Sequence, residues 1–154
     1  MLLTVFTPTY NRAHLLGRVY ASLQKQTCRD FEWVIVDDGS TDNTEVVVKG
    51  FIAEADFPIR YFKQPNGGKH RAINRGVREA RGEAIFIVDS DDSVSPNGLA
   101  VIAEEYRSVR HDSAFGGVSG CMASHRGVAI TPMFPTVRRD FDDVKCIDCN
   151  FLKI

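Results

Sequence analysis

The sequence predicts a doubly wound α/β fold, in which a mostly parallel sheet is flanked by helices. Four short apolar runs of strand-forming residues alternate with four segments whose apolar residues recur at helical spacing. Each parallel crossover in such a sheet needs a covering helix, which this alternation supplies. With 154 residues, of which 44% are hydrophobic and 25% charged, the chain is long enough for one core. We therefore expect a single domain over residues 1–154.

Residues 2–6 form the first expected strand, a short apolar run that stops at a polar turn. The segment after this turn is expected to be a helix, because its apolar residues recur on one face: Leu15, Leu16, Val19, Tyr20 and Leu23. Asn11 or Thr9 is available to cap the start of the helix, since both side chains carry an oxygen that accepts a backbone N–H.

Residues 31–36 form the second expected strand, which is nearly all aromatic or β-branched and runs into an acidic turn. Asp42 and Glu45 then have the spacing of a capping box, and the apolar residues between 47 and 55 supply one face of a helix. Three consecutive valines and the interior Gly50 favour a strand by local propensity, which is the alternative for this segment.

The last two units repeat the alternation. Residues 59–62 form a third strand, and the helix that begins at Lys69 has a small apolar stripe, with Gly82 as its end signal. Residues 84–88 are a continuous apolar run, which is typical of a parallel strand covered on both faces. Pro96 marks the start of a fourth helix, because proline is favoured at the first helical position.

The pattern is weaker after residue 111, with strand-like stretches at 113–122 and 128–130. Of the four cysteines, Cys28, Cys121, Cys146 and Cys149, the last two form the one recognisable pair. This pair is compatible with half of a zinc site or with a redox pair, but no second pair accompanies it. We expect reduced thiols, as in a cytosolic protein.

Charge and hydropathy narrow the partners of the chain. Nineteen Lys and Arg against twenty Asp and Glu leave a formal net charge of -1, which gives no long-range field for nucleic acid. No apolar run approaches the roughly 20 residues that cross a bilayer, and the first residues lack the basic start of a signal peptide. We expect a cytoplasmic protein that binds no nucleic acid, has no transmembrane segment and holds any anionic ligand through local groups.

Polar clusters follow all four expected strands, at 7–11, 37–40, 66–69 and 89–92. Ligands of doubly wound sheets bind at the carboxyl ends of the strands, near the point where the strand order reverses. We therefore expect the four clusters to meet at one edge of the sheet.

The sharpest of these clusters is the run from Asp89 to Asp92, in which three carboxylates follow a buried strand. Carboxylate oxygens suit a hard cation such as Mg²⁺ or Mn²⁺, which typically joins them to substrate phosphates. The alternative is an acidic cluster that interacts with the dipole of the following helix. Three neighbouring carboxylates repel one another, which favours the metal role.

Two other clusters allow either a structural or a binding interpretation. The run from Asp37 to Ser40 is compatible with a simple turn, or with a carboxylate that accepts the N–H of a uracil ring or a ribose hydroxyl. Gly67 and Gly68 before Lys69 resemble a phosphate cradle, but a helix-entry turn explains them equally well. The spacing excludes a Walker loop, because His70 stands where that motif requires Ser or Thr.

Four motifs, in this order, resemble the nucleotide-sugar-binding half of the family-2 glycosyltransferases with the GT-A fold. They are residues 4–12, residues 22–27 followed by 31–42, residues 66–69 with 72–76, and residues 89–92 with Pro96. The resemblance covers about residues 2–106. It implies that residues 1–110 are the donor-binding core and that 111–154 begin an acceptor-side region.

The resemblance also implies a role for each matching residue. A nucleoside diphosphate sugar, UDP-linked, is expected to contact Thr7, Pro8, Thr9, Asp37, Asp38, Lys69, Asn74, Asp89 and Ser90. Asp91, with Asp92, is expected to hold Mn²⁺ or Mg²⁺, which offsets the charge that develops on the leaving diphosphate.

What the resemblance leaves open is catalysis. Similar family members carry a catalytic aspartate in a later acceptor-binding segment, and the sequence stops at Ile154 before one. The pair Asp142-Asp143 comes too early, so we assign no catalytic residue and expect a truncated chain. Inverting transfer to an acceptor hydroxyl, of a glycan or a lipid-linked sugar, is the expected reaction. Surface-polysaccharide assembly, at the inner face of the membrane, is the setting that the family implies.

Two alternatives differ from a glycosyltransferase in function class. The first is a non-catalytic sugar-nucleotide-binding module or partner subunit, for which the apolar residues 151–154 suggest a homodimer. The second is phosphoryl transfer through an aspartyl nucleophile at Asp89, which we rank below the others. Ser93 departs from the residues that such phosphatases prefer at that position.

Overall fold

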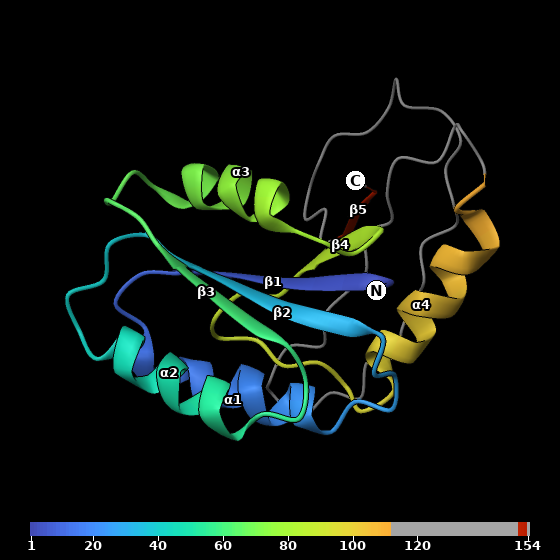
Figure 1. The fold of residues 1–154 in the computed structure, drawn as a ribbon, viewed down its shortest axis with the longest axis horizontal. Coiled ribbons are helices and arrows are strands. Elements are labelled where there is room, and N and C mark those ends of the chain that lie inside the picture. Colours follow the sequence, from blue (N-terminus) through green and yellow to red (C-terminus); the bar gives the residue numbers. More distant parts are fainter. Residues whose placement is uncertain (112–150, 154) are drawn as a thin grey trace, which may run out of the picture.

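The computed structural model describes residues 1–111 and 151–153, which form one five-stranded sheet with helices on both faces (Figure 1). The strands are β1 (Leu3–Thr9), β2 (Phe31–Asp37), β3 (Ile59–Lys63), β4 (Ala84–Ile87) and β5 (Phe151–Lys153). The helices are α1 (Ala13–Gln24), α2 (Thr44–Glu54), α3 (Lys69–Glu79) and α4 (Gly98–Val109). This order of elements confirms the α/β fold that the sequence predicts.

The strand order is β3-β2-β1-β4-β5, and the first four strands are parallel. The chain runs outward from β1 through β2 to β3 and then returns to the other side of β1 with β4. The strand order therefore reverses between β1 and β4, where a doubly wound sheet opens a crevice for ligands. β5 pairs antiparallel with β4 and was not expected, whereas the expected strands at 113–122 and 128–130 lie outside the described residues.

Helices on both faces bury the central strands completely. One apolar cluster packs α1, α2 and α4 against the sheet, and the other packs α3 against the opposite face (Figure 1). Every residue of β1 and β2 is buried, as expected for parallel strands between two helical layers. Val48 is the one apolar residue of α2 that is fully buried, and Ile52 is exposed, so the apolar face of α2 is narrower than predicted.

Asp42 stabilises the starts of two helices: its contact with α2 was predicted, whereas its contact with α1 replaces the caps predicted for that helix. Its carboxylate accepts the backbone N–H of Ala13 at 3.1 Å and that of Thr44 at 3.0 Å. Neither Asn11 nor Thr9 caps α1. Asn11 has a positive φ of 51° and accepts the N–H of Thr41 instead. Because Asp42 lies 29 residues beyond the start of α1, no local pattern could have indicated this contact.

Two further end signals are displaced. α3 ends at Glu79 rather than at Gly82, whose N–H donates to the hydroxyl of Thr4. A side chain at Gly82 would collide with the backbone of Leu3, so the glycine is needed for close approach to β1 and not as a helix cap. α4 begins two residues after Pro96.

Within the described ranges, no helix combines the length and the apolar character needed to cross a bilayer. Cys28 is a half-buried free thiol, and the other three cysteines lie outside the described residues.

Candidate functional site

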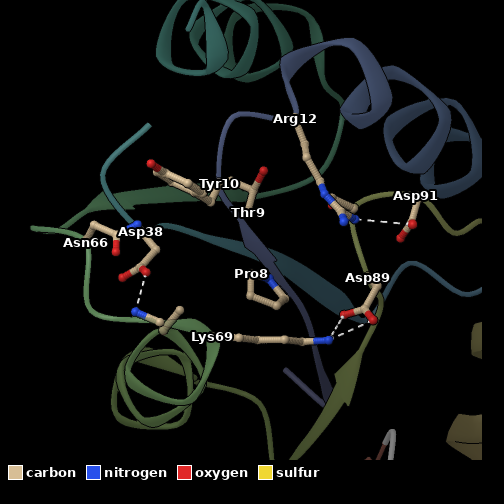
Figure 2. Close-up of a pocket in the computed structure, with 12 residues that line it drawn as sticks. Pro8, Thr9, Tyr10, Arg12, Asp38, Asn66, Lys69, Asp89 and Asp91 are labelled. Carbon is tan, nitrogen blue, oxygen red and sulfur yellow. Dashed lines mark hydrogen bonds and ion pairs between the residues drawn. The ribbon is translucent and has the colours of Figure 1, made fainter. Parts of the chain in front are cut away.

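A cavity of about 420 Å³ lies at the carboxyl ends of β1, β2 and β4, beside the start of α3 (Figure 2). All four polar clusters predicted to converge contribute to its lining, together with Arg12 and Ala72: Pro8, Thr9, Tyr10, Arg12, Asp38, Asn66, Gly68, Lys69, Ala72, Asp89, Ser90 and Asp91. The cavity sits at the switch point of the strand order, as the general rule for doubly wound sheets requires.

Asp38 shapes one side of the cavity by holding the glycine turn. Its carboxylate accepts the N–H groups of Gly67 at 3.1 Å and Gly68 at 2.6 Å, and the side-chain amide of Gln64 at 2.7 Å. Burial on its own raises the pKa of Asp38, but these donors outweigh it and lower the pKa below its usual value. Asp38 is therefore ionised at neutral pH, with most of its acceptor capacity already used.

Gly68 adopts a positive φ of 93°, which orients the turn so that α3 begins at Lys69. The Lys69 ammonium reaches across the cavity and lies 2.8 Å from both oxygens of Asp89 (Figure 2). On the opposite wall, Arg12 Nη1 lies 3.2 Å from Asp91 Oδ2 and donates to Ser90 Oγ at 3.4 Å. Two cations from different elements thus neutralise two carboxylates of the acidic cluster.

The acidic cluster itself has the geometry of a cation site. One carboxylate oxygen from each of Asp89, Asp91 and Asp92 lies within 4.8 Å of the others. Burial, together with the charges of Asp91 and Asp89, raises the pKa of Asp92 above its usual value. The crowding of negative charge and the all-oxygen donor set fit a hard divalent cation such as Mg²⁺ or Mn²⁺.

Thr9 contributes a polar atom that has no partner in the described part of the chain. Thr9 is among the lining residues of the cavity, and its hydroxyl is buried and makes no hydrogen bond there. A buried hydroxyl without a partner costs on the order of 1–3 kcal/mol.

Three predicted binding residues lie outside the lining of the cavity. The Thr7 hydroxyl is fully buried and accepts a hydrogen bond from the Trp33 indole at 2.9 Å. Asp37 is also fully buried, where it accepts the N–H of Ser40 at 2.7 Å and the hydroxyl of Tyr61. Asn74 is exposed on α3. The structure thus brings Pro8, Thr9, Asp38, Lys69, Asp89, Ser90 and Asp91 together, with Asp92 beside Asp91.

Four lining residues had no predicted binding role, namely Tyr10, Arg12, Asn66 and Ala72, although Tyr10 and Asn66 lie in clusters that were predicted to converge. Tyr10 and Arg12 belong to the first motif and follow β1 directly, so their position at the carboxyl end of a central strand was the available signal. Nothing in the sequence paired Arg12 with Asp91, because the contact joins residues 79 positions apart. The pair Asp142-Asp143 lies outside the described residues.

The acidic cluster and the glycine turn face each other across the switch point of a doubly wound sheet. This arrangement defines a Rossmann-like domain of the GT-A class. The chain belongs to the glycosyl transferase family 2, whose model matches residues 4–138. This membership confirms the resemblance of the four motifs and displaces the aspartyl-phosphate alternative.

Individual relatives agree with this assignment. The glycosyltransferase GlyG of Streptococcus pneumoniae is 36% identical over 116 residues, which are 75% of this chain and 38% of GlyG. Among solved structures, S. aureus TarS 1–349 in complex with UDP-GlcNAc superposes with a TM-score of 0.69 at 29% identity, over 83% of this chain and 37% of that one. The mannosyltransferase PcManGT from Pyrobaculum calidifontis, in complex with GDP-Man and Mn²⁺, gives 0.66 at 28% identity, over 79% and 35%.

The chain therefore spans well under half the length of each of these three proteins. The similarity to these proteins concerns the fold and the four motifs.

Proposed function

We propose that this chain binds a nucleoside diphosphate sugar, UDP-linked, together with a divalent cation, as the donor-binding part of a glycosyltransferase. The observation that carries the proposal is the convergence of the four strand-end clusters on one cavity of about 420 Å³. One wall offers the Asp38 carboxylate and the Lys69 ammonium, and the other offers the acidic cluster. The TarS complex with UDP-GlcNAc supports a uridine nucleotide as the ligand.

On the base side, we propose that Asp38, Pro8 and Thr9 receive the nucleoside. Pro8 and Thr9 line this side of the cavity, and Asp38 retains part of its acceptor capacity for the N–H of uracil. Thr7 and Asp37 act on the ligand indirectly, because their buried hydrogen bonds fix the ends of β1 and β2. Asn74 remains a predicted contact. It lies on α3 outside the lining of the cavity, so the donor would have to extend beyond the cavity to reach it.

On the phosphate side, we propose that Asp89 and Ser90 contact the ribose and that Lys69 contacts the diphosphate. Lys69 already lies at the rim of the cavity with its ammonium held by Asp89. A diphosphate competes for this cation and for Arg12, so both salt bridges are expected to rearrange when the donor binds. Lys69 and Arg12 can therefore exchange their carboxylate partners for the oxygens of an anionic ligand.

Asp91 and Asp92 are the residues that would hold Mn²⁺ or Mg²⁺. When bound, the cation supplies Lewis-acid neutralisation of the charge on the leaving nucleoside diphosphate. The PcManGT complex, which contains Mn²⁺, supports a divalent cation as part of the proposal. Transfer with inversion to an acceptor hydroxyl, of a glycan or a lipid-linked sugar, is the reaction that we propose for the whole protein.

Calorimetric titration of UDP, with and without Mn²⁺, tests the proposal on wild type and Asp91→Asn. We expect Mn²⁺ to tighten UDP binding in wild type by at least about tenfold and to have little effect in the variant. Asp56→Asn is a matched control, because Asp56 also forms a 3.2 Å ion pair with an arginine, Arg29, but on a distant surface. Equal UDP affinity in all three proteins, whether Mn²⁺ is present or not, would contradict the proposal.

Turnover separates an enzyme from a non-catalytic sugar-nucleotide-binding module. The measurement is UDP release from UDP-sugars by the full-length protein in the presence of acceptor. Donor binding without any release would favour the binding module, and a dimer in light scattering would support its role as a partner subunit.

A further inference from the structure

α1 carries a row of polar side chains that faces the segment after β4. Arg18, Ser22 and Gln26 are spaced by four residues, which places them along one side of the helix and its C-terminal extension. Residues 22–27 are one of the motifs of the family resemblance, yet none of them lines the cavity. Gln26 is 3% exposed, which is unusual for a glutamine and calls for a complete set of hydrogen-bond partners.

The Gln26 amide joins three pieces of backbone. Its Nε2 donates to the carbonyl oxygen of Ser22 at 3.0 Å and to that of Ser95 at 2.7 Å. Its Oε1 accepts the N–H of Leu99 at 3.0 Å, one of the N–H groups at the start of α4 that have no partner within the helix. One buried side chain thus ties the end of α1 to the start of α4.

Ser22 and Thr27 add two contacts to the same segment. The Ser22 hydroxyl donates to the carbonyl oxygen of Val19 at 2.7 Å and accepts the N–H of Val94 at 3.1 Å. The N–H of Thr27 donates to the carbonyl oxygen of Pro96 at 3.0 Å. We call Ser22, Gln26 and Thr27 the α1 clamp.

The clamp fixes one end of the acidic segment, residues 89–93. The other end is fixed by the sheet, because the N–H of Val88 donates to the carbonyl oxygen of Phe6 at 2.8 Å. Between these ends, Asp92 N–H donates to the Asp89 carbonyl at 3.0 Å, and Arg18 donates to the Asp91 carbonyl at 3.2 Å. The backbone that carries the three carboxylates is therefore held from both sides.

We propose that the α1 clamp positions the acidic cluster for its cation, with Gln26 as the principal positioning residue. Three carboxylates that lie within 4.8 Å of one another repel, so a freely moving segment would separate them. Because the backbone is held in place, the repulsion between the carboxylates is already overcome when the protein folds, and the affinity for the cation is therefore higher. The inference rests on the proposed function, because it assumes that the cluster binds a divalent cation.

Gln26→Met tests the clamp, because methionine keeps the length of the side chain and removes every hydrogen bond. Gln24→Met is the matched control: Gln24 is exposed at the end of α1, two residues before Gln26, and its amide contacts the Tyr20 hydroxyl and not the acidic segment. Free Mn²⁺ is measured by electron paramagnetic resonance with protein and UDP, and uridine affinity is measured without metal. Uridine reports mainly the nucleoside wall at Asp38, and its ribose contacts at Asp89 and Ser90 lie next to Val88, which the sheet holds independently of the clamp.

We expect Gln26→Met to weaken Mn²⁺ binding by about tenfold, the lower end of the range for groups that orient metal ligands. Uridine affinity of this variant, and both affinities of Gln24→Met, should match wild type. Ser22→Ala is a second, milder variant that loses the contact with Val94 and should weaken Mn²⁺ binding less. All measurements are made well below the melting temperature of each protein.

The outcomes separate the clamp from the proposed function. If wild type binds Mn²⁺ with UDP and both Gln26→Met and Ser22→Ala bind it equally well, the clamp has no positioning role. Parallel losses of Mn²⁺ and uridine affinity would show a general structural role and would likewise overturn the inference. If wild type itself shows no Mn²⁺ binding that depends on Asp91, the proposed function fails, and the clamp hypothesis with it.

Discussion

Both the fold and the candidate site depend on the side chain of Asp38, which the substitution Asp38→Asn changes. The carboxylate of Asp38 accepts three donors, from Gln64, Gly67 and Gly68, and so fixes the turn that presents Lys69 to the cavity. Asparagine has nearly the same shape, but one of its two terminal atoms is an N–H donor. That atom must face either the glycine N–H groups or the Gln64 amide, all of which are donors themselves.

The magnitude follows from these three contacts. At least one buried donor loses its acceptor, which costs about 1–3 kcal/mol, and the remaining bonds lose the charge that strengthens them, at about 1 kcal/mol each. The free energy of unfolding should therefore fall by about 3–5 kcal/mol. For a domain of this size, the melting temperature should fall by roughly 10 °C.

The pH dependence has a definite sign. The folded-state pKa of Asp38 is lowered from its ordinary value of 3.8, so the carboxylate stabilises the fold above that value. This contribution is lost as the pH falls through the depressed folded-state pKa. The stability gap between wild type and Asp38→Asn should be complete at neutral pH and should narrow below pH 3.8.

Thermal unfolding, followed by circular dichroism at neutral and at acidic pH, measures both effects. Asp56→Asn serves as the control, because it removes an exposed carboxylate and should change stability very little. An Asp38→Asn protein that melts with wild type at pH 7, or a gap that widens as the pH falls, would refute the reasoning.

Three further predictions concern stability, and urea unfolding tests each of them. Gly76→Ala should lower the free energy of unfolding by about 1–2 kcal/mol, because the new methyl group overlaps the buried Phe6 ring. This overlap outweighs the gain of about 1 kcal/mol in helix propensity, and an unchanged urea midpoint would contradict the prediction. Asp42→Ala should cost about 2 kcal/mol, since two helices lose a cap, and a loss far below that value would show that the caps are redundant. Glu32→Gln should cost about 3 kcal/mol, because the fully buried carboxylate pairs with Arg60 and accepts the Thr4 hydroxyl. UDP affinity should be unchanged in Glu32→Gln, as Glu32 lies at the amino end of β2, away from the cavity.

The sequence predicted the fold and the convergence of the site for the same reason. Continuous apolar runs between amphipathic segments have few solutions other than a parallel sheet between helical layers. Once the strands were placed, the switch-point rule brought Asp38, Lys69 and Asp91 to one edge, and the cavity includes all three. Local pattern and general topology were sufficient for that part of the account.

Thr7 and Asp37 show where position along a strand was not enough. Both lie near the carboxyl ends of their strands, but alternate residues of a strand point to opposite faces. Thr7 shares its face with Leu3 and Val5, and Asp37 shares its face with Trp33 and Ile35, so both side chains turn into the core beneath α1 and α2. The alternation of side chains along each strand therefore indicates, from the sequence, that Thr7 and Asp37 face the core.

Other features depend on contacts that no local pattern contains. Asp42 reaches the start of α1, and Arg12 reaches Asp91, only because the folded chain brings distant segments together. The antiparallel pairing of β5 with β4 is of the same kind, since residues 151–153 are separated from β4 by more than sixty positions. Such contacts become visible once the topology is known.

The central claim is that one cation and one diphosphate are held between the acidic cluster and the glycine turn. Paramagnetic broadening of backbone amide signals by Mn²⁺, with UDP present, tests this claim directly. The account predicts that the amides of Ser90, Asp91, Gly67 and Gly68 broaden together, while Glu32, at the other end of the sheet, stays sharp. Broadening confined to acidic residues elsewhere, such as Glu104 and Glu105, or no broadening that depends on UDP, would contradict it.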